Sequence, residues 1–556
     1  MVEVLIALVL VGIISITMVS FVNDHHQRYR LAVAKADLTR IAESIQLAEE
    51  RTGKRVTTLS EPSGGITSML APYLLEIPAT DPWGNRFALD ASKKRYIPGV
   101  VGDPYAVDVG LGRLISAGPD GEINTPIGQD PPDTENDLVV DFRRKPWITY
   151  AAGKQLAIAT ADGATRQAIP AVVAPAVAPN YANIAISPDA SWYAAIKDNN
   201  ALVVGPVDET STAVKAVIPR PTGKQPELAA LDVNGDTFPI FYPNGSSLLF
   251  ISKKDLYRYD IGLDRVVPLT TDGFFGAADA ASGSRTMWSN LRGSTYTFNA
   301  GSGGTYTITI STDGKIAFSH PGETGSGLYL VSASGNDAKM VKASVVSNGL
   351  LPVAWISTDT LIYMTNPSVG TDKYFYKIRM DGRDVGIALH SKPIPTGISL
   401  PVASPDGNLI SFFSTDSQGA LLRTDGSGFV KQTSDGLFDP FSYAAGFNSN
   451  VVPVWSRDSS TVYFVGRDGT LVRLPVPTKD SPSQTVSTIA NATGSAGLQP
   501  QAVELNTDET LCGLVSSNPA GLYIVPLLGP PGARTEIRTP PLAPGEVPCV
   551  RWMDHQ

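Results

Sequence analysis

Acidic side chains and two cysteines are the potentially reactive or metal-binding groups that stand out in this sequence. Glu3 stands directly before an uncharged, mostly apolar run, Val4 to Val22. A second acidic group follows the turn signal Asp120-Gly121 and contains Asp130, Asp133, Glu135, Asp137 and Asp141. Clustered carboxylates together with turn carbonyls are what a hard, oxygen-seeking cation requires. A solvated acidic loop is the alternative interpretation of this second group.

The sequence lacks the residues and motifs of most other metal, catalytic and nucleotide-binding sites. The sequence has 5 His and 2 Cys, too few for a zinc site rich in these ligands. It contains no Gly-x-Ser-x-Gly elbow, His-Glu-x-x-His motif, phosphate loop or dinucleotide fingerprint. A net charge of −9 argues against nucleic acid as a partner. We therefore predict no enzyme, although a carboxylate pair in a channel would not be visible in sequence.

Cys512 and Cys549 allow two interpretations. In an oxidising compartment they could form one disulfide bond. The alternative is a pair of reduced, buried thiols.

The N-terminal residues predict one long helix over residues 1–52. The run Val4 to Val22 is long enough to cross a bilayer. A signal peptide is disfavoured, because no basic stretch precedes the run and the helical pattern continues after it. An apolar stripe then recurs at spacings of three and four, at Leu31, Ala34, Leu38, Ile41, Ile45 and Ala48. Gly53 is a suitable C-cap residue, so the helix would be about 78 Å long.

Glu3 is a functional candidate by its position. An ionised group at the edge of a membrane segment costs free energy, so such residues often serve a purpose. The alternative is a carboxylate that lies among lipid headgroups without a role.

The segment Met1-Val-Glu-Val-Leu-Ile-Ala-Leu-Val-Leu-Val-Gly-Ile-Ile-Ser-Ile16 closely resembles the N-terminus of type IV pilins and type II secretion pseudopilins. The resemblance implies a basic leader removed by a prepilin peptidase. It also implies that Glu3 matches the Glu that is the fifth residue of the family's mature chain, and that it pairs with the N-terminal amine of a neighbouring subunit. On this basis the sequence begins about two residues after the expected mature start.

Two further segments resemble the major pseudopilin. Asp81-Pro-Trp-Gly-Asn85 is similar to its Asp-Pro-Trp-Gly-Asn element, and Ile115-Ser-Ala-Gly-Pro-Asp-Gly121 with Thr134-Glu-Asn-Asp137 is similar to its calcium loop. The resemblance covers residues 1–142 and implies Ca²⁺ held by Asp120, Asp137 and the carbonyl of Ala117. The loop between the acids is longer than in the family, with Pro126, Pro131 and Pro132.

After Trp147 short β-rich runs alternate with turns, and one turn motif recurs about every 50 residues. It occurs at Ser187-Pro-Asp189, Tyr242-Pro-Asn-Gly245, Ser311-Thr-Asp-Gly314, Ser357-Thr-Asp359, Ser404-Pro-Asp-Gly407, Ser456-Arg-Asp458 and Asn506-Thr-Asp508. This period predicts an all-β propeller over residues 147–556, with eight blades or alternatively seven. The repeats are similar to those of TolB-type propellers, and we interpret their Asp residues as turn-formers.

Three details refine the propeller prediction. Pro548-Cys-Val-Arg-Trp552 lies on the repeat period, so the C-terminal strand should share a blade with residues 155–160 and 166–169. An insertion at 276–304 should form the most exposed loop. Tyr257, Trp288, Tyr374 and Tyr376 could line a ligand site, or they could simply pack between blades.

We thus expect an α+β pilin module, with a helix at 1–52 (filament core 1–22) and a small globular part at 53–146, followed by the propeller. The resemblance implies a homo-oligomeric helical filament, a pilus or a secretion pseudopilus, assembled from the inner membrane and found at the bacterial cell surface or in the periplasm. The propeller would display a surface for a glycan or protein ligand. The alternative is a membrane-tethered propeller enzyme acting on a glycan or peptide.

Overall fold

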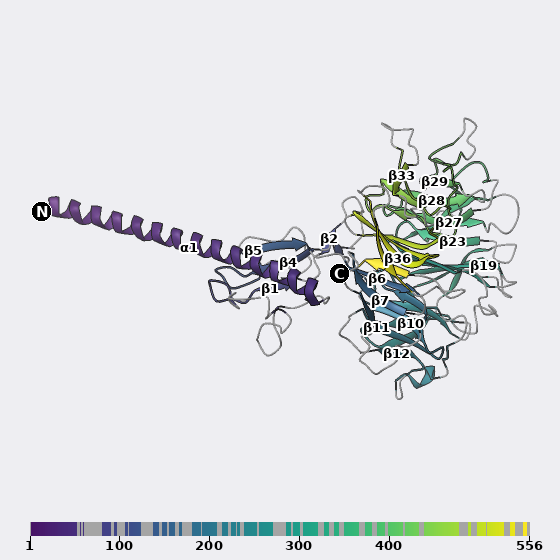
Figure 1. Cartoon of the computed structure of the whole chain (residues 1–556), viewed down its shortest axis with the longest axis horizontal. Helices are drawn as coiled ribbons and strands as arrows, with labels where there is room; N and C mark the ends of the chain where they lie inside the picture. The colour runs from purple at the N-terminus through teal and green to yellow at the C-terminus, as the bar shows by residue number, and fades with distance from the viewer. Residues whose placement is uncertain are drawn as a thin grey trace. The chain divides into compact units, whose positions relative to one another are not determined.

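The computed structural model consists mostly of β-strands, with one long helix at the N-terminus (Figure 1). It describes the chain except for residues 1, 53–55, 57–58, 60–69, 71–79, 91–93, 97–105, 109–110, 124–136, 144–146, 153–154, 162–165, 170–180, 189, 191, 208–213, 221–223, 230, 234–237, 253–254, 271–284, 291–292, 301–303, 321–326, 333–337, 344–349, 366–372, 381–385, 395–397, 415–417, 433–438, 478–486, 491–497, 507–508, 528–533, 540–548 and 553–556.

The chain divides into two compact units. Unit 1 comprises Met1–Tyr96, Ala106–Lys145 and Gln556, and unit 2 comprises Ile97–Tyr105 and Pro146–His555. The main division therefore falls between Lys145 and Pro146, close to the junction expected from the change in sequence pattern.

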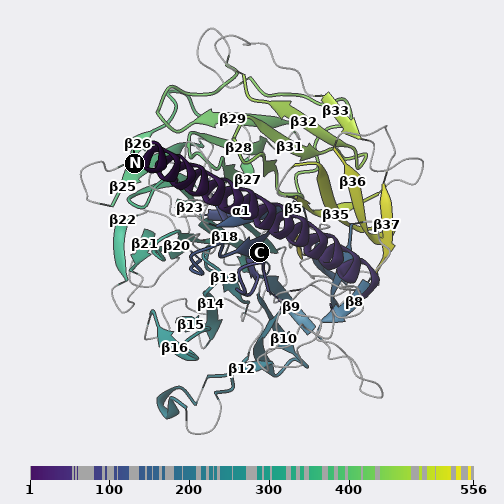
Figure 2. The same ribbon diagram turned by 90° about the vertical axis from the view of Figure 1, so that its left-hand side faces the viewer.

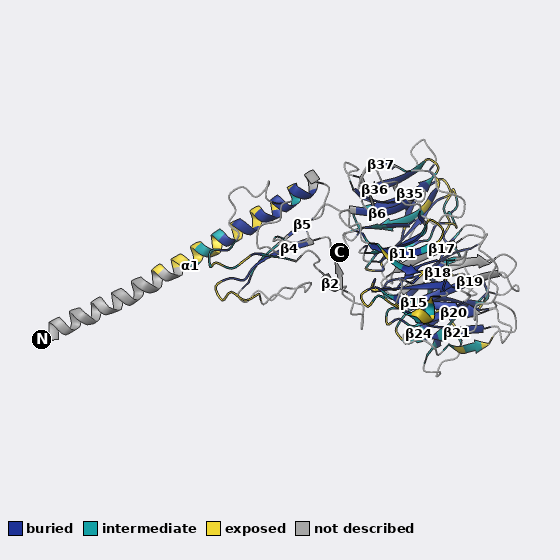
Figure 3. Ribbon diagram, turned by 90° about the horizontal axis from the view of Figure 1, so that it is seen from below, coloured by how far each residue is buried: buried dark blue, intermediate teal, exposed yellow. Residues whose placement is uncertain are grey.

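Helix α1 spans Val2–Thr52 and carries the expected apolar stripe in its second half. Ala34, Leu38 and Ile45 are completely buried, and Ile41 and Ala48 belong to the same buried face (Figure 3). Leu31 does not: its side chain is 40% exposed. The stripe prediction is therefore correct from Ala34 onward and wrong at Leu31, because the underlying sheet covers only the last turns of the helix.

A three-stranded antiparallel sheet covers that buried face. Its order is β1-β4-β5, with bounds Ala88–Asp90, Leu111–Ser116 and Leu138–Arg143. Side chains alternate across a strand, so Leu114, Phe87 and Phe142 lie on the face that packs against the helix. Strands β2 (Lys94–Tyr96) and β3 (Ala106–Asp108) form a separate two-stranded ladder.

Unit 2 contains eight antiparallel sheets among its described residues, and we number them in chain order. Sheet 1 is β38 (Cys549–Trp552), β6 (Trp147–Ala152), β7 (Gln155–Thr160) and β8 (Arg166–Ile169); sheet 2 is β9 (Tyr181–Ile186), β10 (Trp192–Lys197), β11 (Ala201–Pro206) and β12 (Lys215–Ile218); sheet 3 is β13 (Ile240–Phe241), β14 (Ser247–Ser252), β15 (Asp255–Asp260) and β16 (Arg265–Pro268). Sheet 4 is β17 (Arg285–Asn290), β18 (Gly293–Ala300), β19 (Gly304–Ser311), β20 (Ile316–His320), β21 (Gly327–Val331) and β22 (Lys339–Ala343); sheet 5 is β23 (Leu350–Trp355), β24 (Thr360–Thr365), β25 (Phe375–Arg379) and β26 (Ile387–Ala388). Sheet 6 is β27 (Ile398–Ala403), β28 (Leu409–Ser414) and β29 (Gly419–Arg423); sheet 7 is β30 (Val454–Trp455), β31 (Thr461–Val465), β32 (Leu471–Pro475) and β33 (Ser487–Ala490); sheet 8 is β34 (Pro500–Leu505), β35 (Leu511–Ser517), β36 (Ala520–Pro526) and β37 (Thr535–Arg538). A short 3₁₀ helix, η1 (Pro226–Leu228), lies between sheets 2 and 3.

The sheets follow one another around a ring, the arrangement of a β-propeller (Figure 2). Each sheet shares a buried apolar cluster with the next sheet in the chain, from sheets 1 and 2 through to sheets 7 and 8. A further cluster joins sheet 8 back to sheet 1, through residues such as Val515, Ile148 and Trp552. The apolar contacts therefore form a closed circuit.

The two ends of unit 2 meet in sheet 1. Strand β38 pairs directly with β6, with Trp552 opposite Ile148, and β7 and β8 complete the sheet. The prediction that the C-terminal strand shares a sheet with residues 155–160 and 166–169 is confirmed. The direct partner is the intervening strand β6, which the sequence pattern did not reveal.

The prediction that the insertion at 276–304 forms a loop is wrong for Arg285–Asn290 and Gly293–Ala300, which are strands. Strand β17 pairs with β18, and β18 pairs with β19, so the two strands extend the four-stranded part of sheet 4, β19 to β22. Strand β18 also contacts β13 and β23, the first strands of the two flanking sheets. The hairpin therefore lies on the inner side of the ring, and residues 276–284 lie outside the described set.

A tryptophan contact repeats between neighbouring first strands. The indole N–H of Trp355 donates to the carbonyl of Thr309 over 3.4 Å, and that of Trp455 donates to Val402 over 3.3 Å. Trp552 makes the same contact across the closing seam, to the carbonyl of Glu504 over 3.0 Å. The closing seam thus uses the same contact as the internal seams.

We predict that Trp552→Phe lowers the free energy of unfolding by about 1–3 kcal/mol, since it leaves the partly buried Glu504 carbonyl without the indole donor. The matched variant Trp355→Phe should cost about as much, and both are measured by chemical denaturation. If Trp355→Phe is destabilising and Trp552→Phe is not, the C-terminal strand does not close the ring.

Candidate functional site

The Asp81 carboxylate organises the loop that the sequence singled out in unit 1. One of its oxygens accepts the backbone N–H groups of Trp83 at 3.0 Å and Asn85 at 2.8 Å. The other accepts the hydroxyl of Ser116 at 2.6 Å, and both Asp81 and Ser116 are buried. A buried carboxylate needs such donors, so Asp81 holds its own turn and ties it to the end of β4.

Asn85 makes a second connection between the same two segments. Its side-chain amide donates to the carbonyl of Gly118 over 2.9 Å. At Gly121, where φ is +78°, an added Cβ would lie 3.1 Å from the Asn85 side-chain oxygen. The segments Asp81–Asn85 and Ile115–Gly121 are therefore packed together, a contact that their separate positions in the sequence did not predict.

The three expected calcium ligands lie at this end of the sheet. Ser116 pairs with Leu138, so Ala117, just after β4, and Asp137, just before β5, lie at the same end of the hairpin. Asp120 is exposed in the turn after Ala117, and one of its oxygens accepts the Glu122 N–H at 3.1 Å. Asp130, Asp133 and Glu135 lie outside the described residues.

No group of three or more His, Cys, Asp or Glu side chains that could hold a metal occurs within the described part of the chain. The expected set contains only two carboxylates, with a main-chain carbonyl as the third ligand. Oxygen donors of this kind fit Ca²⁺, and the calcium site stays a prediction.

Glu3 lies in the first turn of α1, and its side chain is outside the described set. Within the described residues, no helix is both long and apolar enough to cross a membrane. The role of Glu3 and of residues 1–22 stays a prediction.

Cys512 and Cys549 are free and buried, so the disulfide alternative is not formed in this structure. Cys512 lies between sheets 7 and 8, whereas Cys549 lies between sheets 1 and 2. Burial raises the pKa of Cys512 to about 12 and that of Cys549 to about 11. Both are therefore poor nucleophiles at neutral pH.

The repeated Ser-x-Asp segments form turns between the first and second strands. In sheet 6 the Ser404 hydroxyl donates to Asp406 over 2.5 Å and accepts the Leu409 N–H at 3.0 Å. In sheet 5 the Ser357 hydroxyl, followed by that of Thr360, lowers the pKa of Asp359. These aspartates stabilise their own turns, as turn-formers do.

Successive turns are also linked to one another around the ring. Lys315 donates to the Thr358 carbonyl over 2.6 Å, and the Asp406 N–H donates to the Ser459 hydroxyl over 3.0 Å. The Arg457 N–H donates to the Glu509 carboxylate over 2.6 Å. The repeat therefore serves the contacts between sheets as well as each turn.

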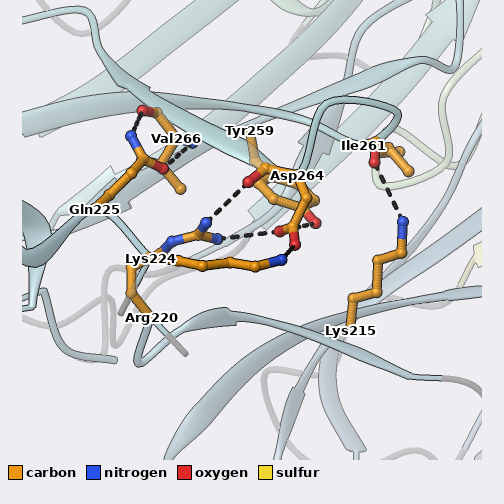
Figure 4. Close-up of polar contacts among 8 residues, drawn as sticks. All are labelled: Lys215, Arg220, Lys224, Gln225, Tyr259, Ile261, Asp264 and Val266. Carbon is orange, nitrogen blue, oxygen red and sulfur yellow. Dashed lines mark hydrogen bonds and ion pairs between the residues drawn. The ribbon is translucent and has the colours of Figure 1, made fainter. Parts of the chain in front are cut away.

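An ionic clamp joins the connection after sheet 2 to the turn between β15 and β16 (Figure 4). The guanidinium of Arg220 donates to the Asp264 backbone carbonyl over 2.9 Å and lies 3.4 Å from its carboxylate. Lys224 forms an ion pair with the same carboxylate, and the Tyr259 hydroxyl donates to it over 3.0 Å. The Arg220 side chain is only 1% exposed, so a partner charge is required there.

A second pair of contacts fixes the same connection. The Gln225 amide accepts the Val266 N–H at 2.8 Å and donates to the Val266 carbonyl over 2.7 Å (Figure 4). Lys215 donates to the Ile261 carbonyl over 3.3 Å. Sequence reasoning missed this clamp, because no local motif links residues about forty positions apart.

His390 is a buried histidine with both ring nitrogens bonded to main chain. Nε2 accepts the Phe375 N–H at 3.0 Å, which requires Nδ1–H to donate to the Lys392 carbonyl over 2.5 Å. The ring stacks on Tyr374 at 5.3 Å and lies 5.0 Å from Phe429. Burial lowers the pKa of His390, and the arrangement holds the neutral imidazole.

No protein-family model matches the chain, and no curated protein matches its sequence. Solved structures with a similar arrangement include a eukaryotic initiation factor, with a TM-score of 0.43 and 11% identity over 74% of this chain and all of the other. A putative TolB from Agrobacterium tumefaciens has a TM-score of 0.28 and 20% identity, covering 45% and 79% of the two chains. Dipeptidyl peptidase 4 of Porphyromonas gingivalis has a TM-score of 0.39 and 10% identity, covering 68% and 57%. At these low scores the assignment of a propeller rests on the sheet order and the closed circuit of clusters.

We predict that His390 makes stability fall in mild acid. A histidine whose pKa is lower in the folded state binds its proton more readily when unfolded. Its contribution is therefore complete above the unfolded pKa, about 6.5, and is lost as the pH falls below that value, with a slope of up to about 1.4 kcal/mol per pH unit.

The measurement is chemical denaturation between about pH 7.5 and 4.5. His390→Gln, whose amide can both accept and donate, should show a shallower dependence on pH than the wild type. His25→Gln, at an exposed position on the helix, serves as the control. Parallel curves for the wild type and His390→Gln would contradict the assignment.

Proposed function

We propose that this protein is a pilin-like subunit of an extracellular type IV pilus or pseudopilus-type filament. It assembles through its N-terminal helix and displays a β-propeller for surface interaction or adhesion. The observation that carries this proposal is α1, one uninterrupted helix from Val2 to Thr52 with two different halves. The second half packs on the unit 1 sheet, and the first contains the uncharged run Val4 to Val22.

The first half of the helix needs a different environment from the second. An apolar run of this length is stable in a bilayer or in a bundle of helices, because its backbone groups are already satisfied. Val22 and Tyr29 are 61% and 65% exposed, where the helix leaves the sheet. Neighbouring helices in a filament would cover such side chains.

The packed loops of unit 1 support the pilin assignment. The two segments that resemble the major pseudopilin, Asp81–Asn85 and Ile115–Gly121, contact each other through Asp81, Ser116 and Asn85. We therefore propose processing by a prepilin peptidase, residence in the inner membrane before assembly, and a final location in a surface filament or periplasmic pseudopilus.

The propeller is the displayed part of this proposal, and we propose that it has eight blades. Eight sheets and eight inter-sheet clusters among the described residues support this number over seven. Its ligand would be an extracellular glycan or protein. We place display ahead of catalysis because the repeated aspartates, the most numerous candidate acids, are engaged in their own turns.

Ca²⁺ at Asp120, Asp137 and the Ala117 carbonyl would close the loop beside the Asp81 network. We predict that Ca²⁺ raises the thermal midpoint of unit 1, by binding only the folded state, and that chelation reverses the shift. Asp120→Asn should abolish the response, whereas Glu122→Gln, two residues away, should not. A midpoint that is unaffected by Ca²⁺ in the wild type would show that the site does not exist.

Glu3→Gln tests the assembly function directly. A buried carboxylate needs a cationic partner, and the N-terminal amine of a neighbouring subunit would provide it. We expect the variant to accumulate in the membrane fraction while filament yield falls at least about tenfold, since each lost pairing weakens a contact by about 1 kcal/mol or more. Glu43→Gln, exposed on the same helix, is the control. Normal filaments from Glu3→Gln would contradict the proposed pairing.

A further inference from the structure

Four aromatic residues stood out in the sequence as candidates for a ligand site, and their burial and contacts in the structure differ. Tyr257 is only 8% exposed and stacks on Phe250 at 5.6 Å, so it is a packing residue. The side chain of Trp288 lies outside the described set. Tyr374 and Tyr376 are partly exposed at β25 of sheet 5. These two remain as candidates.

Tyr374 and Tyr376 form the middle of an ordered row of rings. Tyr376 stacks on Tyr363 with centroids 5.2 Å apart and planes 16° apart. Its centroid lies 6.0 Å from that of Tyr374, which stacks on His390 at 5.3 Å and 9°. The two end members are buried, Tyr363 to 2% and His390 to 4% exposure. The buried rings therefore fix the positions of the two partly exposed rings.

The hydroxyls in the middle of the row point to a role beyond packing. Within the described residues, no hydrogen bond joins the hydroxyl of Tyr374 or Tyr376 to another protein group, in contrast to Tyr259, whose hydroxyl bonds Asp264. A tyrosine offers a flat apolar face with a polar tip at a low cost in side-chain entropy. Two such rings, held in place from both ends, form a prepared contact surface.

Polar groups from two sheets meet at the Tyr363 end of the row. An added Cβ at Gly386, where φ is +74°, would lie 2.7 Å from the Tyr363 hydroxyl oxygen and 3.9 Å from Nζ of Lys342. Lys342 belongs to β22 of sheet 4, whereas Tyr363 belongs to sheet 5. The absence of a side chain at Gly386 leaves room for a hydroxyl and an ammonium group beside the rings.

We propose that this row, defined by Tyr363, Tyr374, Tyr376 and Lys342, is a glycan-binding site. A hexose ring presents flat C–H faces that pack on aromatic rings, and its hydroxyls pair with tyrosine hydroxyls and with an ammonium donor. A chain of sugars would run along the row, with one sugar oxygen or carboxylate at Lys342. The inference rests on the part of the proposed function in which the propeller is displayed outside the filament. It identifies the class of ligand that the displayed propeller binds.

The test uses the full-length chain in a zwitterionic detergent without sugar groups, titrated by calorimetry. Two hexasaccharide probes are compared, neutral cellohexaose and acidic hexagalacturonate. Binding of either probe is expected. Stronger binding of the acidic probe, lost in Lys342→Met, would assign a carboxylate to Lys342, and equal binding would assign a hydroxyl.

Variants locate the site on the row. Tyr376→Ala and Tyr374→Ala should each weaken binding at least about tenfold, as expected for an aromatic anchor. Tyr376→Phe keeps the ring and should retain binding to within about threefold, which separates loss of the contact from loss of folding. Tyr29→Ala, at an exposed tyrosine of the helix, should have no effect.

Two results would overturn the inference. One is the absence of binding by either probe at millimolar concentration, and the other is binding that the Tyr374, Tyr376 and Lys342 variants leave unchanged. Filament yield, measured in parallel on the Tyr374, Tyr376 and Lys342 variants, should stay normal. A failure of sugar binding with normal filaments would therefore disprove this site without affecting the assembly proposal.

Discussion

Unit 2 depends on one constraint, that its first and last strands belong to the same sheet. Strand β38, at the end of the unit's sequence, pairs with β6, at its beginning. Without this pairing, β6 and the clusters on both sides of sheet 1 would be exposed. An unpaired strand edge is a site for aggregation, and closure of the ring removes it.

The contacts at the closing seam match those inside the ring. Trp552 donates to the first strand of the preceding sheet, as Trp355 and Trp455 do. Arg551 adds an ion pair with Glu504 at the same seam. Arg551 and Trp552 lie 47 and 48 residues from Glu504, so these contacts hold β38 on the sheet that precedes it in the chain. The pairing of β38 with β6 joins segments far apart in the chain and carries the largest loss of chain entropy.

Local patterns predicted a large part of this architecture. The spacing of Ala34, Leu38 and Ile45 identified the buried face of α1, because helical periodicity reports which side meets a core. The Ser-x-Asp turns identified the sheets, because a tight turn needs particular residues at fixed positions. The segment Pro548 to Trp552 identified the closing strand, because it lies on the repeat period of the unit.

Long-range contacts were not predictable in the same way. The Arg220–Asp264 clamp joins residues with no shared motif, and the hairpin β17–β18 takes its place from pairing with β19 rather than from its own composition. In unit 1 the sequence indicated Asp81 and Ser116 as parts of two separate segments, and only the fold shows their hydrogen bond. The turns and seams form the scaffold on which we propose that partly exposed side chains such as Tyr374 and Tyr376 bind a ligand.

Hydrogen exchange of the backbone amides of β38 can show whether this strand pairs with β6 and so closes the ring. If β38 completes sheet 1, the amides of Val550 and Trp552 should exchange as slowly as those of β6 and β7, through opening of the whole unit. Exchange of β38 at the rate of a free C-terminal segment, while β6 and β7 stay protected, would contradict closure of the propeller through its termini.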